Sequence, residues 1–539
     1  MTKFISNIIY PSLISIVIYL FFFYPLLDPQ TLIYSGKDSI RLHYLSRIYL
    51  YDNFQNNQFP FWTERMFGGF PIFYDLERGY QNLDNIILVY LFGPYNSYKI
   101  IHFICYLLGT VSLFLLFKKK YSFEKNEIYL YYAAAVLIYY FSFFHLIHQQ
   151  HFNFILATYL LPFLVYCLEY LIDTSKLRYT VLLSYCLYFI FTLGSTQIFL
   201  TIILFLILYF LNFYNYRQKN NITNLVLVLL FTFLLIFPGA VSYYSLYSKS
   251  SRSEFSNFYQ GSLDSNLLVT FVYPHPFGLT NYLGTNLSEN YTKNESLLYL
   301  GIISILIFTL FFRNLKPETI KFGICLLILF TVMNFINLPP FNYFRYWVRA
   351  EFLFSFYYAF FLPEILIKSS KLLTKSLKYL LLLIIYLLPF LLNKNLIYIF
   401  KNSIPLDFIN VTIPFFGLVI VFFTAILFIR KYSLVLLVLI IIDSAYFFSI
   451  SKGSLFMKQN EIFYQNITTT NSLKNFDSDY SLAYSSKNNS GYTQLAIKEG
   501  LNNQSHYISI DLVLKLYLIA LVMYFSLLVV LYKKYEIKI

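Results

Sequence analysis

Long apolar runs, each about the length that crosses a bilayer, recur along nearly the whole chain. Because a hydrocarbon core roughly 30 Å thick takes about 20 residues of α-helix, each run is a candidate transmembrane helix. The pattern predicts an all-α fold, a polytopic transmembrane bundle of about 14 helices. The run at 8–27 is too long for a signal-peptide core, so we expect it to be the first of them. The expected spans are 8–27, 98–117, 127–144, 152–172, 179–193, 197–213, 223–243, 297–312, 320–336, 351–367, 376–393, 411–429, 432–449 and 511–532.

Basic residues mark one side of this predicted bundle. If the N-terminus lies in the cytoplasm and the helices alternate in direction, every even-numbered helix ends in a short loop that contains Lys or Arg. This charge bias is typical of cytoplasmic loops, so we predict a multi-pass cell-membrane protein with both termini in the cytoplasm. The basic groups are Lys118–Lys120, Lys176 and Arg178, Arg217 and Lys219, Arg313 and Lys316, Lys368, Lys371 and Lys375, Arg430 and Lys431, and Lys533 and Lys534.

The long polar segments all fall on the opposite, extracytoplasmic side, where we therefore expect the chemistry. They are 28–98, 244–296, 337–350, 394–410 and 450–510. We predict four parts: a transmembrane core whose outer loops include 28–98 and 244–296 (1–365), additional transmembrane helices (366–449), a short outer segment (450–510), and a final helix with a cytoplasmic tail (511–539).

Composition agrees with a membrane protein and excludes some functions. The chain is 58% hydrophobic and 12% charged, whereas soluble domains carry about 25% charged residues. The cytoplasmic loops explain its net charge of +14, and no basic soluble module is present that would bind nucleic acid. The four cysteines lie within apolar runs, which indicates neither a disulfide framework nor a metal site. The chain also lacks a glycine-rich nucleotide loop and the GxSxG and HExxH motifs.

The first outer segment is the richest in candidate functional residues. After Asp38, apolar residues mix with Arg41, His43 and Arg47 in a pattern typical of an amphipathic helix on the membrane surface. The segment continues with Phe59-Pro60-Phe61-Trp62, Gly68-Gly69-Phe70-Pro71 and Asp75-Leu76-Glu77-Arg78.

Further candidate segments follow in order along residues 1–365. They are His145–Asn153 leading into Leu161-Pro162 and Glu169, Gly194–Gln197, Pro274–Gly278 with Glu295 and Tyr299–Gly301, and Pro339–Arg349. Together with the first outer segment, this order resembles the C-type (GT-C) glycosyltransferase superfamily, and most closely its YfhO-type bacterial membrane proteins.

The resemblance implies a fold with many transmembrane helices, a large first external loop and an acidic residue after the first helix. It also implies an activity, the transfer of a sugar from a polyprenyl-phosphate donor in the membrane to a glycan, lipid or protein acceptor of the cell envelope. Asp38 would then be the general base that activates the acceptor hydroxyl. The alternative is that Asp38 only caps the surface helix.

Several residues are candidates for binding the phosphate or the rest of the substrate. Arg41 and His43 follow Asp38 closely, and arginine presents two parallel donors to phosphate oxygens, although Arg41 could instead reach lipid headgroups. Arg345 and Arg349 lie four residues apart just before an outer helix end, where positive charge runs against the orientation bias. The other candidates are His148, His151, Arg252 and Glu295.

Two groups are candidate metal ligands, which would make Mg²⁺ or Mn²⁺ a possible cofactor. Asp75 and Glu77 present carboxylates of the kind these ions prefer, and a solvated pair is the alternative. His145, His148 and His151 repeat every three residues, which on a helix keeps them on one side to bind a metal or a phosphate. For these histidines the alternative is interfacial anchoring or helix capping.

Two other classes of function stay open at this point. A lipid or glycan transporter predicts repeated halves and polar residues at mid-membrane depth. No inverted repeat is evident, and Asp443 is nearly alone at depth, where we expect structural hydrogen bonds within the bundle. A non-catalytic envelope protein would keep the fold and lack the activity.

Overall fold

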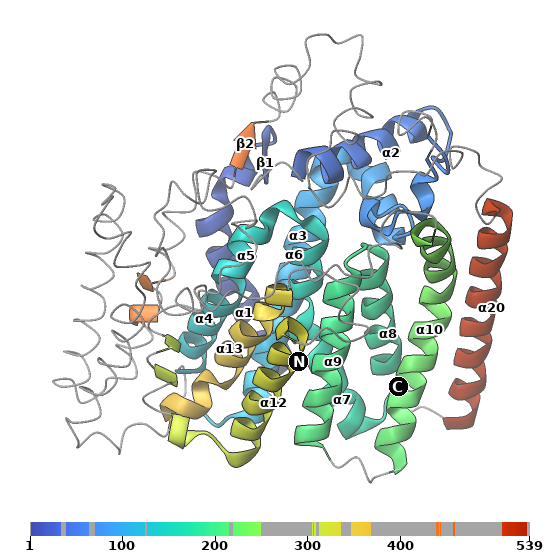
Figure 1. The fold of residues 1–539 in the computed structure, drawn as a ribbon. Coiled ribbons are helices and arrows are strands. Elements are labelled where there is room, and N and C mark those ends of the chain that lie inside the picture. The colour runs from blue at the N-terminus through green and yellow to red at the C-terminus, as the bar shows by residue number, and fades with distance from the viewer. Residues whose placement is uncertain are drawn as a thin grey trace.

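The computed structural model describes residues 2–33, 39–63, 70–123, 127–214, 219–248, 312–335, 347–367 and 509–535, and short pieces at 304–305, 307–308, 438–440, 442–443 and 456–458. This part of the chain is a helical bundle (Figure 1), with 87% of its residues in helices. Eight of the described helices are long and apolar enough to cross a membrane. A ninth span results if the bent pair Glu127–Tyr140 and Phe144–Gln150 is counted as one. The described residues therefore form an all-α, multi-pass bundle.

The described helices overlap the predicted spans, with an earlier start for α3, and the predicted total of about 14 is not confirmed. The predicted spans 376–393 and 411–429 lie outside the described residues, as does most of 297–312 and 432–449. The long helices are α1 (Thr2–Phe23), α3 (Leu83–Lys120), α4 (Glu127–Tyr140), α6 (Phe152–Tyr159), α7 (Leu161–Thr174), α8 (Leu177–Thr192), α9 (Thr196–Phe213), α10 (Lys219–Tyr247), α12 (Pro317–Phe335), α13 (Phe352–Ile367) and α20 (Ile510–Tyr535). Shorter helical elements are η1 (Tyr24–Leu27), η2 (Ser39–Tyr44), α2 (Leu45–Gln55), η3 (Ile72–Tyr74), η4 (Leu76–Arg78), α5 (Phe143–Ile147), η5 (His148–Gln150), η9 (Phe312–Asn314) and η11 (Trp347–Glu351).

α3 begins well before its predicted start. Asn82 caps it by accepting a hydrogen bond from the backbone N–H of Asn85 at 2.9 Å. The helix is interrupted at Gly93, which has a left-handed φ of 76°, and Pro94 follows. A glycine in this conformation before a proline breaks the helical ladder, so the hydropathy pattern identified only the part after the break.

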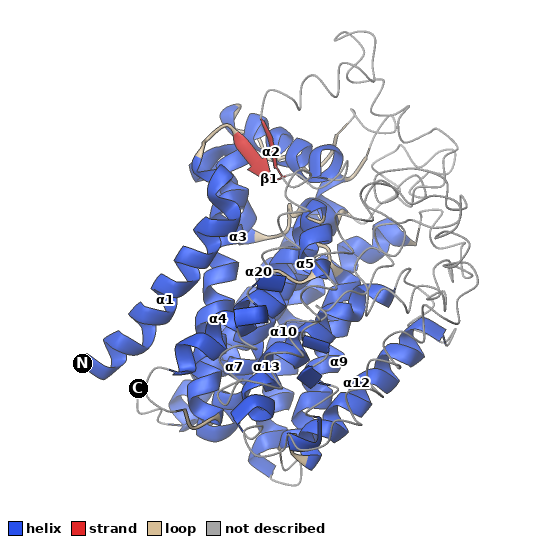
Figure 2. Cartoon of the chain, turned by 90° about the vertical axis from the view of Figure 1, so that its left-hand side faces the viewer, coloured by secondary structure: helices blue, strands red, loops and turns tan. Residues whose placement is uncertain are grey.

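Charged residues connect the ends of neighbouring helices at one end of the bundle. We call this end, which contains Lys118–Lys120 and Asp173, the basic end. Lys119 Nζ at the end of α3 lies 2.5 Å from Asp173 Oδ2 at the end of α7. Lys120 Nζ lies 4.4 Å from the ring centroid of Phe213, the last residue of α9. Figures 1 and 2 show that α1 begins and α20 ends toward this end. The helices thus alternate in direction, and the cytoplasmic position of this end stays a prediction.

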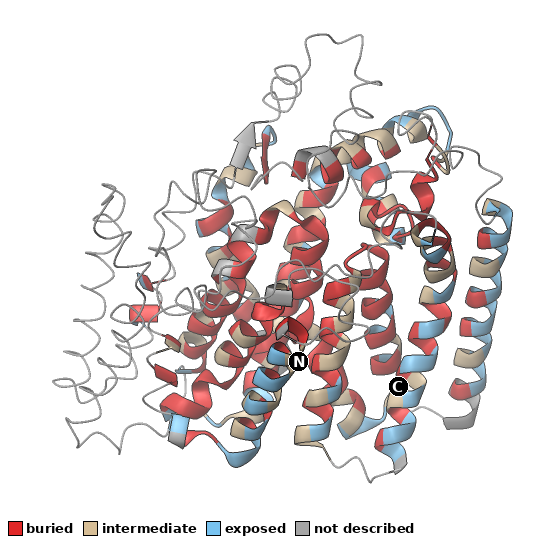
Figure 3. Ribbon diagram, viewed as in Figure 1, coloured by how far each residue is buried: buried red, intermediate tan, exposed pale blue. Residues whose placement is uncertain are grey.

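Burial divides the bundle into central and peripheral helices (Figure 3). The apolar window of α13 is 83% buried and that of α6 and α7 is 78% buried, against 17% for α20. Apolar side chains such as Leu518 and Phe525 are exposed along α20. In a bilayer, lipid tails would cover such side chains, which is why a membrane helix does not need a polar outer face.

Buried tyrosines hold the central helices together. Tyr139 donates to the carbonyl oxygen of Thr158 at 2.6 Å, and Tyr140 donates to that of Tyr159 at 3.2 Å. Gly109 of α3 lies against the second of these bonds, because a Cβ there would come within 2.0 Å of the Tyr159 carbonyl oxygen and 2.2 Å of the Tyr140 hydroxyl. The small residue allows the close approach, and each tyrosine buries a large ring without leaving its hydroxyl unpaired.

The opposite end of the bundle, which we call the loop end, carries η2 and α2. The predicted non-spanning helix after Asp38 is confirmed as a π-helix continuing into α2, which lies across this end (Figure 1). The prediction that this helix has a polar outer face is wrong for His43 and Arg47, because both side chains are buried. Arg47 donates to Ser97 Oγ, which compensates for the loss of water, and His43 packs against the ring of Phe152.

Two short strands join distant outer segments. β1 (Thr31–Ile33) pairs antiparallel with β2 (Phe456–Lys458), with Thr31 opposite Lys458. The strands belong to the predicted outer segments 28–98 and 450–510, so these segments meet. Asp443, expected to bond within the bundle, is buried.

Candidate functional site

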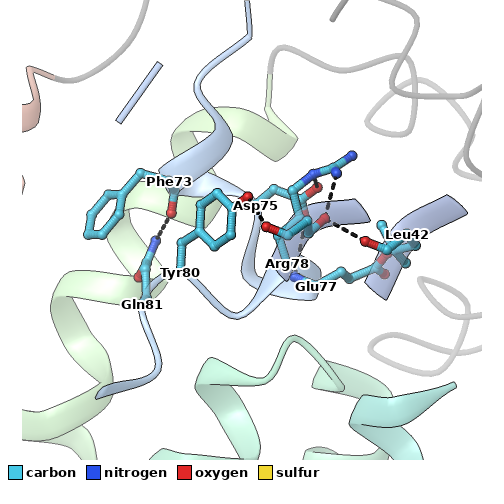
Figure 4. Close-up of polar contacts among 8 residues, drawn as sticks. Leu42, Phe73, Asp75, Glu77, Arg78, Tyr80 and Gln81 are labelled. Carbon is cyan, nitrogen blue, oxygen red and sulfur yellow. Dashed lines mark hydrogen bonds and ion pairs between the residues drawn. The ribbon is translucent and has the colours of Figure 1, made fainter. Parts of the chain in front are cut away.

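An ion pair anchors the end of the first outer segment (Figure 4). Arg78 Nε donates to Asp75 Oδ2 at 3.0 Å, and Asp75 Oδ1 accepts from the backbone N–H of Glu77 at 3.1 Å. Arg78 Nη1 also donates to Ser46 Oγ of α2 at 2.9 Å, and Tyr80 donates to the Ser46 carbonyl at 2.6 Å. The segment around η4 is thereby fixed against α2 by buried polar contacts.

This arrangement does not fit a divalent cation at Asp75. Both of its carboxylate oxygens already accept hydrogen bonds, and Arg78 supplies the positive charge that a metal would bring. Among the described residues, no three His, Cys, Asp or Glu side chains form a group that could hold a metal ion. An Mg²⁺ or Mn²⁺ ion at Asp75 and Glu77 would have to displace Arg78.

Aromatic stacking connects η2 to the start of α6. The ring of Phe152 stacks on His43 at 4.7 Å and on Tyr98 at 3.5 Å between centroids. The Arg47 guanidinium lies 5.5 Å from the Tyr98 centroid and donates to Ser97 Oγ at 2.8 Å. Burial lowers the pKa of Arg47 to about 10, so this guanidinium stays charged at neutral pH.

The three histidines extend from α5 through the 3-10 helix η5, which continues it, to the residue after η5. His145 lies on α5, where its two ring nitrogens pair with Ser142 Oγ at 2.9 Å and Thr158 Oγ1 at 3.1 Å. His148 begins η5 and His151 follows its last residue, and their Nδ1 atoms are 3.0 Å apart. One of these two nitrogens must donate and the other accept, so a hydrogen bond connects the two rings.

Arg349 of η11 reaches the same place from much later in the chain. Its Nη1 donates to Gln197 Oε1 at 3.2 Å, and its guanidinium lies 4.7 Å from the ring centroid of Phe154. His151 stacks on this same phenyl ring at 4.9 Å. The histidine turn, the start of α9 and η11 therefore meet around Phe154, with an arginine and two imidazoles as hydrogen-bonding groups.

The turn before α9 contacts the η4 segment. Gly194 has a left-handed φ of 82°, and a Cβ on it would lie 2.4 Å from Glu77 Cα. Only glycine fits both this backbone conformation and this close approach. Ser195 donates to the carbonyl oxygen of Asn153 at 3.3 Å, so the same turn also contacts the histidine turn.

The structure thus brings several predicted site residues together. His148, His151 and Arg349 surround Phe154. His43 is connected to them by its stack on Phe152. The segment that contains Asp75 and Glu77 is connected to them by the contact of Glu77 with Gly194. The backbone of Arg41 lies in η2, and its side chain is not among the described parts. Asp38, Arg252, Glu295 and Arg345 lie outside the described residues.

Some residues of this region were missed as site candidates. Arg78 pairs with Asp75 three positions earlier, a spacing that the sequence displays, as does the four-residue spacing of His43 and Arg47. Phe152 is one of many phenylalanines, and nothing in the sequence distinguishes it from a core residue.

Comparison with known proteins identifies no relative of this chain. The chain matches no protein-family model, no curated protein and no solved structure. The resemblance to the GT-C superfamily therefore depends on the sequence segments alone.

Proposed function

We propose that the chain is a membrane glycosyltransferase that transfers a sugar from a polyprenyl-phosphate donor to a cell-envelope acceptor outside the cytoplasm. The observation that carries this proposal is the meeting of the histidine turn, the Gly194–Gln197 turn and Arg349 around Phe154. The sequence alone indicates each of these segments as a candidate for function, and they lie far apart along the chain. Their contact gives the proposal a single site.

In this proposal Arg349 and the histidine pair bind the donor phosphate. Arginine presents planar, parallel N–H donors that match phosphate oxygens. In the pair, the ring whose Nδ1 accepts the shared hydrogen bond carries its proton on Nε2 and adds one imidazole donor. A protein environment from which water is excluded strengthens these charge interactions. The same groups would stabilise the phosphate as it leaves, when its bridging oxygen gains negative charge.

Asp38 acts as the general base in the proposed reaction. It directly precedes Ser39, the first residue of η2, whose neighbours are fixed by the Ser46, Arg78 and His43 contacts. Asp38 takes the proton of the acceptor hydroxyl, and that oxygen forms a bond to the anomeric carbon. The bond from this carbon to the phosphate oxygen breaks, and the lipid phosphate leaves with the electron pair. We assign no step to a metal, because Arg78 occupies Asp75.

Sugar transfer in reconstituted membranes tests this function. Full-length protein in liposomes is given a panel of polyprenyl-phosphate sugars and native lipid extract, for wild type, Asp38→Asn and Asp38→Ala. The control is Asp52→Asn, which removes an exposed carboxylate from α2 nearby. We expect transfer by wild type and the control, and loss of transfer with donor binding retained in both Asp38 variants.

Two results would contradict the proposal. Transfer that survives both Asp38 substitutions would exclude Asp38 as the base. Absence of transfer by wild type from every donor would exclude the glycosyltransferase and favour a transporter or a non-catalytic envelope protein.

A further inference from the structure

Two buried polar atoms near the start of α13 have no hydrogen-bond partner in the described part of the chain. They are Oε1 of Glu351, the last residue of η11, and Oγ of Ser355. Each residue is only 1% exposed. Buried polar atoms in folded proteins are nearly always paired, because an unpaired one forfeits its bonds to water without replacement. A ligand that supplies the missing bonds is one physical explanation for such a pair of atoms.

Ser355 differs from several other buried helical serines among the described residues. A serine on a helix usually satisfies its hydroxyl on the carbonyl four residues earlier. For Ser355 that carbonyl belongs to Glu351, and the bond is absent. The serines that do make this bond are Ser15 to Pro11, Ser46 to Leu42 and Ser112 to Leu108.

Glu351 also lacks a hydrogen-bond partner that the buried carboxylate of α13 has. Glu364, near the opposite end of the helix, accepts hydrogen bonds from the backbone N–H of Lys316 and from Thr319 Oγ1. The bundle therefore provides partners for a buried carboxylate when its role is structural. Oε1 of Glu351 has no such partner among the described residues.

The position of the two residues relates them to the proposed donor site. Residues four apart on a helix lie on the same face, so Glu351 and Ser355 point to a common side. Glu351 follows Arg349 on η11, and two residues of a 3-10 helix rise about 4 Å. A sugar ring attached to a phosphate at Arg349 would have to extend over a similar distance to reach them.

We propose that Glu351 and Ser355 form the subsite that binds hydroxyl groups of the donor's sugar ring. A carboxylate accepts hydrogen bonds from sugar hydroxyls, and a serine hydroxyl both donates and accepts. A few such polar groups in an otherwise apolar wall are what gives a small-molecule site its specificity. This inference rests on the proposed function and assigns the recognition of the sugar to residues distinct from those that bind phosphate.

Equilibrium binding of two probes separates the sugar subsite from the phosphate site. The probes are polyprenyl-phosphate sugars and bare polyprenyl phosphate, measured on the full chain in lipid nanodiscs. We compare wild type with Glu351→Gln, Ser355→Ala and the matched control Glu364→Gln. Melting temperatures are recorded for each variant so that a folding defect is recognised.

We expect wild type to prefer at least one sugar-bearing lipid over the bare lipid. Glu351→Gln should reduce this preference roughly tenfold and Ser355→Ala by a smaller factor, because each removes a bond made only to the sugar. Binding of the bare lipid should not change in either. Glu364→Gln should lower the melting temperature and leave the preference intact.

Other outcomes overturn the inference at different levels. If wild type binds both lipids equally, or if both variants keep the full preference, Glu351 and Ser355 do not recognise the sugar, and phosphate binding at Arg349 stands. If wild type binds neither lipid, the proposed function fails, and the sugar subsite fails with it.

Discussion

The imidazole of His43 stacks on the phenyl ring of Phe152, with 4.7 Å between centroids and 14° between the ring planes. This contact joins η2, which directly follows Asp38, to the first residue of α6, which directly follows His151. The proposed base and the proposed phosphate ligands are thus connected through one pair of rings. We therefore expect His43 to have a positioning role in addition to the phosphate contact expected from the sequence.

Substitution of His43 separates these two roles. His43→Phe keeps a flat ring against Phe152, so the free energy of unfolding should stay within about 1 kcal/mol of wild type. His43→Ala removes the stack and should cost about 1–3 kcal/mol. Thermal unfolding in detergent measures both, and donor binding is measured beside it. Wild-type donor binding by His43→Phe would show that the imidazole only packs.

The Asp75–Arg78 pair should be essential for stability. Asp75→Asn leaves the Arg78 charge buried without its counterion, which typically costs about 3–5 kcal/mol. The side chains of this pair are 6% and 5% exposed, against 72% and 65% for Asp511 and Lys515. Asp511→Asn is therefore the control, with an expected cost below about 1 kcal/mol. Equal losses of stability in the two variants would contradict the buried pair.

Gly194 and Gly93 provide a matched test of the turn that contacts η4. Both have a left-handed φ, of 82° and 76°, but a Cβ would lie 2.3 Å from the Glu77 backbone nitrogen at Gly194 and meets nothing within 4 Å at Gly93. Gly93→Ala should cost only backbone strain, about 1–3 kcal/mol. Gly194→Ala adds a clash and should cost clearly more. Similar unfolding midpoints for the two variants would exclude the contact.

Labelling of single cysteines tests the orientation of the bundle. Gln55 lies exposed at the loop end and Thr174 exposed at the basic end, whereas the native cysteines are buried or half-buried. A membrane-impermeant maleimide added to intact cells should label Gln55→Cys and should reach Thr174→Cys only after the membrane is opened. The reverse pattern would invert the predicted topology and place the candidate site in the cytoplasm.

The sequence predicted best those features that depend only on residues close together along the chain. Apolar length predicts α9 and α20 to within a few residues, because a lipid-facing helix must be apolar over the bilayer thickness. It missed the first part of α3, because Gly93 and Pro94 interrupt the helix without ending it. It also missed the pairing of β1 with β2, since so short a ribbon joins segments too distant for any local pattern to connect.

The candidate site was predictable in its components and not in its arrangement. The three-residue spacing of the histidines predicts one helical face, but α5 changes to a 3-10 helix at His148, and His145 pairs with Ser142 and Thr158. Arg349 was a candidate because its charge opposes the orientation bias, but its contact with Phe154 depends on how η11 packs. Glu351 attracts attention only through the missing partner of its carboxylate.

Photo-crosslinking tests most directly whether these segments form one donor site. A polyprenyl-phosphate sugar with a photoreactive group beside its phosphate is bound to the full chain in nanodiscs, irradiated, and the labelled peptides are identified by mass spectrometry. We predict labels in the histidine turn, in Gly194–Gln197 and in Trp347–Ser355, all suppressed by excess unmodified donor. Labels confined to lipid-facing residues of α1 and α20, and unaffected by competitor, would contradict the site.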